Sequence, residues 1–309
     1  MHIPDGLMDP AVFLAGWAVA VVVLAVAMAK VGRTIDQKAV PLMALLAAGI
    51  FMAQMLNFLV GFGTTGHLIG AALAVYMLGP LAAMVVMTAI LLIQGLMFGD
   101  GGITALGLNI LNMAIIAPLT AWGIFALAGR STWSVPVAAW ASVMAGAAAC
   151  AFELSASYTL SGGAYGITGS LAIPAMLGYH ALIGIGEGLI TGGIVAYLTK
   201  VAPEMVRGDP TAVPVPRKRY TNAALGITVL FGIGLVLFFM FSAGMGDGLE
   251  SVMEAAGVEE VTPLFGGLMG YGEDYLSALV AGIIGFAAVF AVIYLAFRRR
   301  KAAEETETQ

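Results

Sequence analysis

The sequence is poor in charged residues. Asp, Glu, Lys and Arg make up 10% of its 309 residues, whereas hydrophobic residues make up 61%. A soluble globular domain is about 25% charged, and the mean hydropathy of +0.99 is far above that of such domains. The composition therefore excludes an ordinary soluble protein and indicates an integral membrane protein.

Cysteine is nearly absent, and the common nucleotide-binding motif is missing. Cys150 is the only cysteine in the sequence, so the chain can form neither an internal disulfide nor a site with several thiolate ligands. No G-x-x-x-x-G-K-[ST] segment occurs, which excludes nucleotide hydrolysis through a P-loop of this chain. Any energy-requiring step must draw on a partner or on an ion gradient.

Long apolar runs, punctuated by charged residues, glycine or proline, predict membrane-spanning helices. A bilayer core of about 30 Å requires about 20 apolar residues per helix, and these runs do not alternate as barrel strands do. We predict an all-α, polytopic transmembrane helical bundle with about nine spans, near residues 11–29, 40–60, 67–79, 81–98, 104–128, 134–158, 174–199, 220–242 and 276–297.

Basic residues decide the orientation, because Lys and Arg accumulate on the cytoplasmic side. With nine spans and the N-terminus outside, all 13 basic residues face the cytoplasm. Merging residues 67–98 into one span would separate the first three basic residues from the other ten. We therefore predict an outer N-terminus and a cytoplasmic C-terminus.

A proline-rich stretch marks one domain boundary. Residues 201–219 contain four prolines and are predicted to form a cytoplasmic linker. It separates a seven-span body, residues 1–200, from a two-span accessory segment, residues 220–297, with a cytoplasmic tail at 298–309. The accessory segment's outer loop, 243–275, carries seven acids. Such a loop can attract cations, but we interpret it as a solvated loop and assign it no ligand role.

The first two residues have the chemistry of a metal chelator. No signal peptide is evident, so we expect Met1 to remain the N-terminal residue. The amine of Met1, the amide nitrogen of His2 and the Nδ1 atom of His2 can close two fused chelate rings around one metal ion. A fourth nitrogen would complete the square-planar field that is typical of Ni(II) or Cu(II).

The fourth ligand has two candidates. His67 follows a glycine-rich loop at the outer end of the third predicted span, on the side of the membrane where the N-terminus lies. His180 lies about two turns inside the seventh span and is the weaker candidate. A single histidine at a membrane edge is more often a packing residue, and it is the pairing with Met1 and His2 that favours His67 as a ligand.

Polar residues inside the predicted spans are further candidates. Glu153 and Glu187 are costly at membrane depth and indicate function, and Glu187 shares a helical face with His180, seven residues earlier. Four amide side chains could orient the ligands or join helices: Asn57, Gln94, Asn109 and Asn112.

Four separated motifs resemble those of one family. They are MHIPDG at residues 1–6, TTGHLIGAAL at 64–73, FGDGGITALG at 98–107 and HALIGIGEG at 180–188. Over roughly residues 1–200 the chain resembles the CbiM/NikM family, the substrate-binding (S) components of energy-coupling-factor (ECF) nickel and cobalt transporters. Residues 220–297 resemble the family's small second component, CbiN/NikN, although GDGLE at 246–250 lacks the proline of its Pro-Asp-Gly-Leu-Glu motif.

The resemblance implies a seven-helix S component that binds its metal through the Met1 amine, the amide and imidazole of His2, and the His67 imidazole. It also implies a membrane-embedded coupling (T) component and two cytoplasmic ABC-type ATPases, none of them in this chain, and no nucleic-acid partner. We expect capture of Ni(II) or Co(II) as substrate at a prokaryotic plasma membrane, with no cofactor and no enzymatic activity. The choice between the two metals and the role of the accessory segment stay open.

Two other classes of function remain as alternatives. The chain could be a self-sufficient, ion-coupled metal carrier that uses Glu153 or Glu187 as a proton relay. It could also be an intramembrane enzyme with Glu187 and His180 as acid and base. No nucleophile or cofactor motif supports the second of these.

Overall fold

The computed structural model describes residues 1–309 except 38, 62, 202–216, 260–261 and 308–309. The predicted linker 201–219 therefore lies almost entirely outside the described residues. The described elements, in chain order, are α1 (Pro10–Thr34), α2 (Val40–Gln54), β1 (Asn57–Gly61), β2 (Thr64–His67), α3 (Ala71–Leu78), α4 (Pro80–Ile93), η1 (Gln94–Phe98), α5 (Leu106–Asn109), η2 (Ile110–Ile116), α6 (Ala117–Ala128), α7 (Ser134–Leu160), α8 (Gly169–Val201), α10 (Arg217–Phe241), α11 (Gly248–Ala255) and α12 (Tyr275–Glu307).

Helices dominate, which confirms the predicted all-α membrane fold. Among the described residues, seven helical stretches are long and apolar enough to cross a membrane: Pro10–Thr34, Pro80–Phe98, Leu106–Ala128, Ser134–Leu160, Gly169–Lys200, Thr221–Phe241 and Tyr275–Arg298. Their outward faces carry apolar side chains such as Leu14, Leu230 and Leu237, each more than half exposed. In a bilayer these faces would contact lipid tails.

The second and third predicted spans differ from the helices observed. Helix α2 ends at Gln54, six residues before the predicted end at 60, and α3 has 8 residues. Between them β1 and β2 form an antiparallel hairpin in which Asn57 pairs with His67. Gly61 and Gly63, at φ 117° and 78°, supply the backbone conformation that the turn requires. The count of nine spans stays a prediction.

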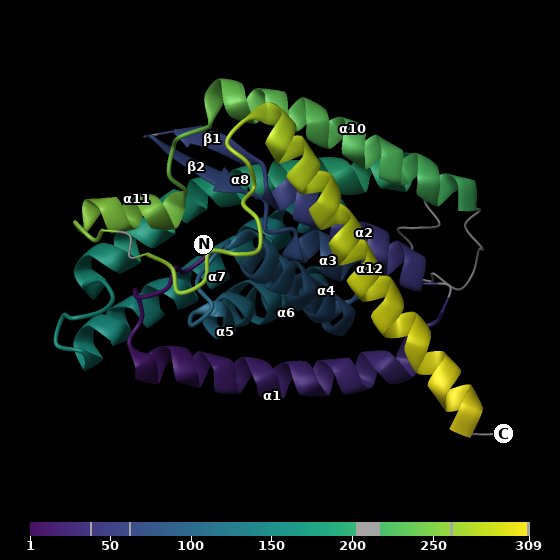
Figure 1. The fold of residues 1–309 in the computed structure, drawn as a ribbon, viewed down its shortest axis with the longest axis horizontal. Helices are drawn as coiled ribbons and strands as arrows, with labels where there is room; N and C mark the ends of the chain where they lie inside the picture. Colours follow the sequence, from purple (N-terminus) through teal and green to yellow (C-terminus); the bar gives the residue numbers. More distant parts are fainter. Residues whose placement is uncertain (38, 62, 202–216, 260–261, 308–309) are drawn as a thin grey trace.

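The hairpin, the N-terminus and α11 lie towards one end of the helices, and the C-terminal part of α12 lies at the other (Figure 1). Helices α7 and α8 pack along each other, and α12 crosses α2 and α4. The accessory segment thus packs against the body through α2, while α11 contacts α8 and β2. This arrangement brings the first residue of the chain next to the loop before α11, where the Met1 amine lies 2.8 Å from Oδ2 of Asp247.

Candidate metal site

The N-terminal segment is held inside the bundle rather than exposed. Met1 is 3% and Ile3 0% exposed. The backbone N–H of Ile3 donates to Oδ1 of Asn109 at 2.8 Å, and the amide of Asn109 donates back to the carbonyl of Ile3 at 3.2 Å. Asp5 accepts hydrogen bonds from the N–H and hydroxyl groups of Thr104 and from the N–H of Leu264. The first residues therefore have a defined position.

The N-terminal amine faces one imidazole and one carboxylate. It lies 3.4 Å from Nε2 of His67 and 2.8 Å from Oδ2 of Asp247. Burial alone would lower the pKa of the Met1 amine, but the attraction of Asp247 raises it above its ordinary value. In the metal-free protein the amine is consequently a buried ammonium paired with Asp247.

His67 presents Nε2 as the free donor atom. Its Nδ1 lies 3.1 Å from the carbonyl of Leu68; since a carbonyl can only accept, Nδ1 carries the proton and Nε2 carries the lone pair. Burial, together with the nearby Met1 amine, lowers the pKa of His67 to about 3. A neutral imidazole with an available Nε2 is the form that binds a metal ion.

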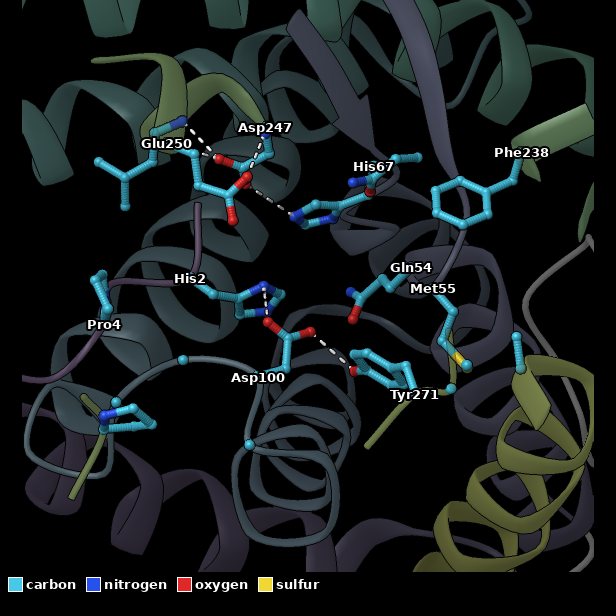
Figure 2. A pocket seen from close by; sticks show the side chains of 18 of the residues that line it. His2, Pro4, Gln54, Met55, His67, Asp100, Phe238, Asp247, Glu250 and Tyr271 are labelled. Atoms are coloured by element: carbon cyan, nitrogen blue, oxygen red, sulfur yellow. Dashed lines mark hydrogen bonds and ion pairs between the residues drawn. The ribbon is translucent and has the colours of Figure 1, made fainter. Parts of the chain in front are cut away.

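His2 is present at the site but turned towards a carboxylate. Its Nδ1 lies 3.0 Å from Oδ1 of Asp100, whose other oxygen accepts a hydrogen bond of 2.8 Å from the Tyr271 hydroxyl. Burial would raise the pKa of Asp100, but attraction to His2 and its hydrogen bond, together with His67 and the Tyr271 hydroxyl, lower it to about 2. The rings of His2 and His67 stack with centroids 5.1 Å apart (Figure 2). Chelation through Nδ1 thus requires the His2 ring to turn away from Asp100.

The other candidates take supporting positions. The Glu187 carboxylate accepts the backbone N–H groups of Ile69 and Gly70 at 2.6 and 2.8 Å, which fixes the turn that follows His67. His180 bonds the carbonyl of Met176 in its own helix through Nδ1, and Asn112 donates to Glu153 at 2.8 Å. His180 lines a small pocket together with Met1, His67 and Asp247, whereas the described hydrogen bonds of the Met1 amine go to His67 and Asp247.

Sequence reasoning assigned no role to Asp247, which the structure places beside the Met1 amine. It caps the N-terminus of α11 and forms a capping box with Glu250, and its Oδ2 lies 4.0 Å from Nε2 of His67 as well as beside the Met1 amine. The D-x-x-E spacing before α11 was a usable signal for a helix start. No spacing in the sequence indicates that this start meets the N-terminus of the chain.

A partly open pocket of about 360 Å³ leads to these groups. Its lining includes His2, His67, Asp100, Asp247 and Tyr271, with side chains from both the body and the accessory segment (Figure 2). Within the described part of the chain, no group of three or more His, Cys, Asp or Glu side chains has the geometry of a metal site.

Comparison with known proteins identifies similar sequences. A family described as "Cobalt uptake substrate-specific transmembrane region", CbiM, matches residues 2–205. A protein of Archaeoglobus fulgidus named "Putative fused nickel transport protein NikMN" is 33% identical over 301 residues, which cover 94% of this chain and 96% of the relative. The "Fused nickel transport protein NikMN" of Rhodobacter capsulatus is 35% identical over 254 residues, 76% of this chain and 73% of the relative.

A solved structure is also similar. The "Crystal Structure of an Truncated Transition metal Transporter" is 41% identical with a TM-score of 0.59, and the match covers 65% of this chain and 99% of that one. The match to the CbiM family covers most of the body, and the match to the fused relatives continues into the accessory segment. The chain therefore belongs to the CbiM/NikM family of nickel and cobalt transport proteins and carries a fused C-terminal segment of the NikN type.

Proposed function

We propose that this chain is the substrate-binding component of an ATP-driven, ECF-type importer, and that it captures Ni(II) or Co(II) on the outer side of a prokaryotic plasma membrane. Its main support is the 3.4 Å approach of the Met1 amine to Nε2 of His67. Chain termini are ordinarily exposed and poorly ordered, whereas this one is buried against an imidazole whose lone pair is available.

Four nitrogens would bind the cation: the Met1 amine, the amide nitrogen and Nδ1 of His2, and Nε2 of His67. The Met1 amine and Nε2 of His67 already lie 3.4 Å apart, and the His2 ring would bring its Nδ1 into the set by turning from Asp100 towards the amine. Asp100 would keep its hydrogen bond from Tyr271. An all-nitrogen, square-planar set suits Ni(II), and the general affinity order places Ni(II) above Co(II) at such a site.

Transport would need partners that this chain does not contain. A membrane-embedded coupling component and two cytoplasmic ABC-type ATPases would move the loaded chain and open the site inward. The alternative, an ion-coupled carrier, needs an acid that can release and take up protons. Glu187 instead accepts two backbone hydrogen bonds and Glu153 accepts one from Asn112, which favours structural roles for both.

The test is to displace the N-terminal amine. Two glycines added before Met1 would move the amine out of chelating position without creating a new chelate, because His2 would then stand fourth in the chain. This variant should abolish tight Ni(II) binding by the purified full chain in detergent, measured by isothermal titration calorimetry. The matched control carries the same two glycines after Gln309 and should bind as the unaltered chain does. Unchanged affinity in the N-terminal variant would refute the proposed ligands.

Partner dependence needs a second measurement. The chain in liposomes should take up radioactive nickel only when the coupling component and the ATPases are present with ATP. Uptake by the chain alone, driven by a proton or sodium gradient, would favour the carrier.

A further inference from the structure

The two oxygens of the Asp247 carboxylate make different contacts. Oδ1 accepts the backbone N–H groups of Leu249 and Glu250 at 2.7 and 3.0 Å, which caps α11. Oδ2 lies 2.8 Å from the Met1 amine and 4.0 Å from Nε2 of His67. The helix cap thus fixes the side chain, and one oxygen remains directed at the candidate metal site.

The loop that carries Asp247 is bonded to the strand that carries His67. The carbonyl of Gly246 accepts the backbone N–H of Thr65 at 3.0 Å, and the hydroxyls of Thr64 and Ser251 lie 2.7 Å apart. A Cβ at Gly248 would lie 2.8 Å from a ring carbon of His180, so the glycine allows α11 to start this close to α8. The accessory segment therefore places Asp247 by several independent contacts.

Charge balance explains why a carboxylate lies here. In the structure the ammonium of Met1 and the carboxylate of Asp247 form a neutral pair. A divalent ion bound by the amine, one amide nitrogen and two neutral imidazoles would release two protons, one from the ammonium and one from the amide, and would leave a complex of charge +1. The carboxylate of Asp247 therefore faces a single positive charge in both cases, and an uncompensated buried charge is strongly unfavourable. Asp100, beside His2 and bonded to Tyr271, contributes the same charge in both.

We propose that Asp247 is a residue of the metal site, supplied by the fused accessory segment, that positions the Met1 amine and balances the charge of the bound cation. This inference rests on the proposed function. It gives the accessory segment a direct part in metal capture, because the body alone supplies the nitrogens but not the carboxylate on the amine side.

Asp247→Asn tests the inference in the full chain. Asparagine is as good a helix cap as aspartate, so the substitution removes the charge and keeps the shape. Ni(II) affinity should fall about 10- to 100-fold, the usual loss when a partner of metal ligands is removed. Glu254→Gln is the matched control, since Glu254 is an exposed acid on the same helix, and it should leave the affinity unchanged. Asp247→Ser provides a second uncharged cap in case the first variant does not fold.

Two readouts separate this inference from the proposed function. The visible absorption band of the Ni(II) complex reports the nitrogen donors, and it should keep its position in Asp247→Asn at saturating nickel. Unaltered affinity in both uncharged variants, with binding still lost on N-terminal extension, would overturn the role of Asp247 alone. Unaltered binding in the N-terminally extended chain would overturn the proposed function first.

Discussion

Oε2 of Glu187 lies 2.6 Å from the backbone nitrogen of Ile69, two residues after His67. The same carboxylate accepts the N–H of Gly70, where the backbone φ of 78° begins α3. A fully buried acid in α8 thereby holds the turn that carries the candidate ligand. Gln54 supports the turn from the other side, because its amide donates to the carbonyl of Ile69 at 2.6 Å.

We expect Glu187→Ala to weaken Ni(II) binding by about 10- to 100-fold, because the turn after His67 loses both hydrogen bonds and the imidazole loses its fixed position. Calorimetry on the purified full chain measures the change. Glu153→Ala is the control: its partner is Asn112 rather than the turn, so it should alter affinity much less. Equal losses of Ni(II) affinity in the two variants would show that the acids act through the stability of the bundle and not through the turn after His67.

His67 and His180 should differ sharply when each is replaced by alanine. Both rings bond a carbonyl through Nδ1. They differ at Nε2, because that of His67 lies 3.4 Å from the Met1 amine, whereas the described hydrogen bonds join His180 to its own helix. His67→Ala should abolish tight binding and shift the visible band of any residual nickel complex, since one nitrogen donor is lost. His180→Ala should keep the band and most of the affinity. A band that shifts only in His180→Ala would reverse the assignment of the fourth ligand.

Much of this site follows from sequence, because its donors are set by residue type and by the N-terminus. Met1, His2 and His67 are predicted together from chelate chemistry and from an orientation that places them on one side of the membrane. The structure brings the Met1 amine and His67 within 3.4 Å. Their role as ligands remains a prediction.

Other parts depend on tertiary contacts that pattern alone does not show. A short apolar run such as residues 56–60 fits a helix or a strand equally well, and here pairing with 64–67 decides for the strand. The His2 ring is directed at Asp100, and Asp247 reaches the Met1 amine through a contact between residues 246 positions apart. Sequence spacing contains no information on that distance.

Acid should destabilise the metal-free protein through His67. The pKa of His67 is lowered to about 3 by burial and by the neighbouring amine, against 6.5 for an exposed histidine. Between these two values the unfolded chain binds a proton that the folded chain does not, so stability falls as the pH decreases from 6.5 towards 3. The detergent-solubilised protein should melt at progressively lower temperature over this interval.

The variant His67→Gln separates the effect of His67 on acid stability from the effects of other titratable groups. Glutamine does not titrate, so the melting temperature of the variant should depend less steeply on pH between 6.5 and 4 than that of the unaltered chain. Identical slopes would mean that His67 is not held neutral in the folded protein, and that acid acts through other residues.

The N-terminal segment packs directly against the backbone at Gly102, where the N–H of Gly102 donates to the carbonyl of Ile3 at 2.8 Å. A Cβ at Gly102 would clash with the backbone nitrogen of Asp5. The substitution Gly102→Ala should therefore push the backbone of residues 4–5 away from Gly102 and displace the segment that carries Met1 and His2. Nickel affinity should fall by about 10-fold or more, since displacing a chelating group by about 1 Å is enough to impair a preorganised site. Gly178→Ala in α8 is the control, because a Cβ there meets nothing within 4 Å, and it should bind nickel normally. If Gly102→Ala binds as tightly as Gly178→Ala, the N-terminal segment reaches its metal-bound position without the close packing seen at Gly102.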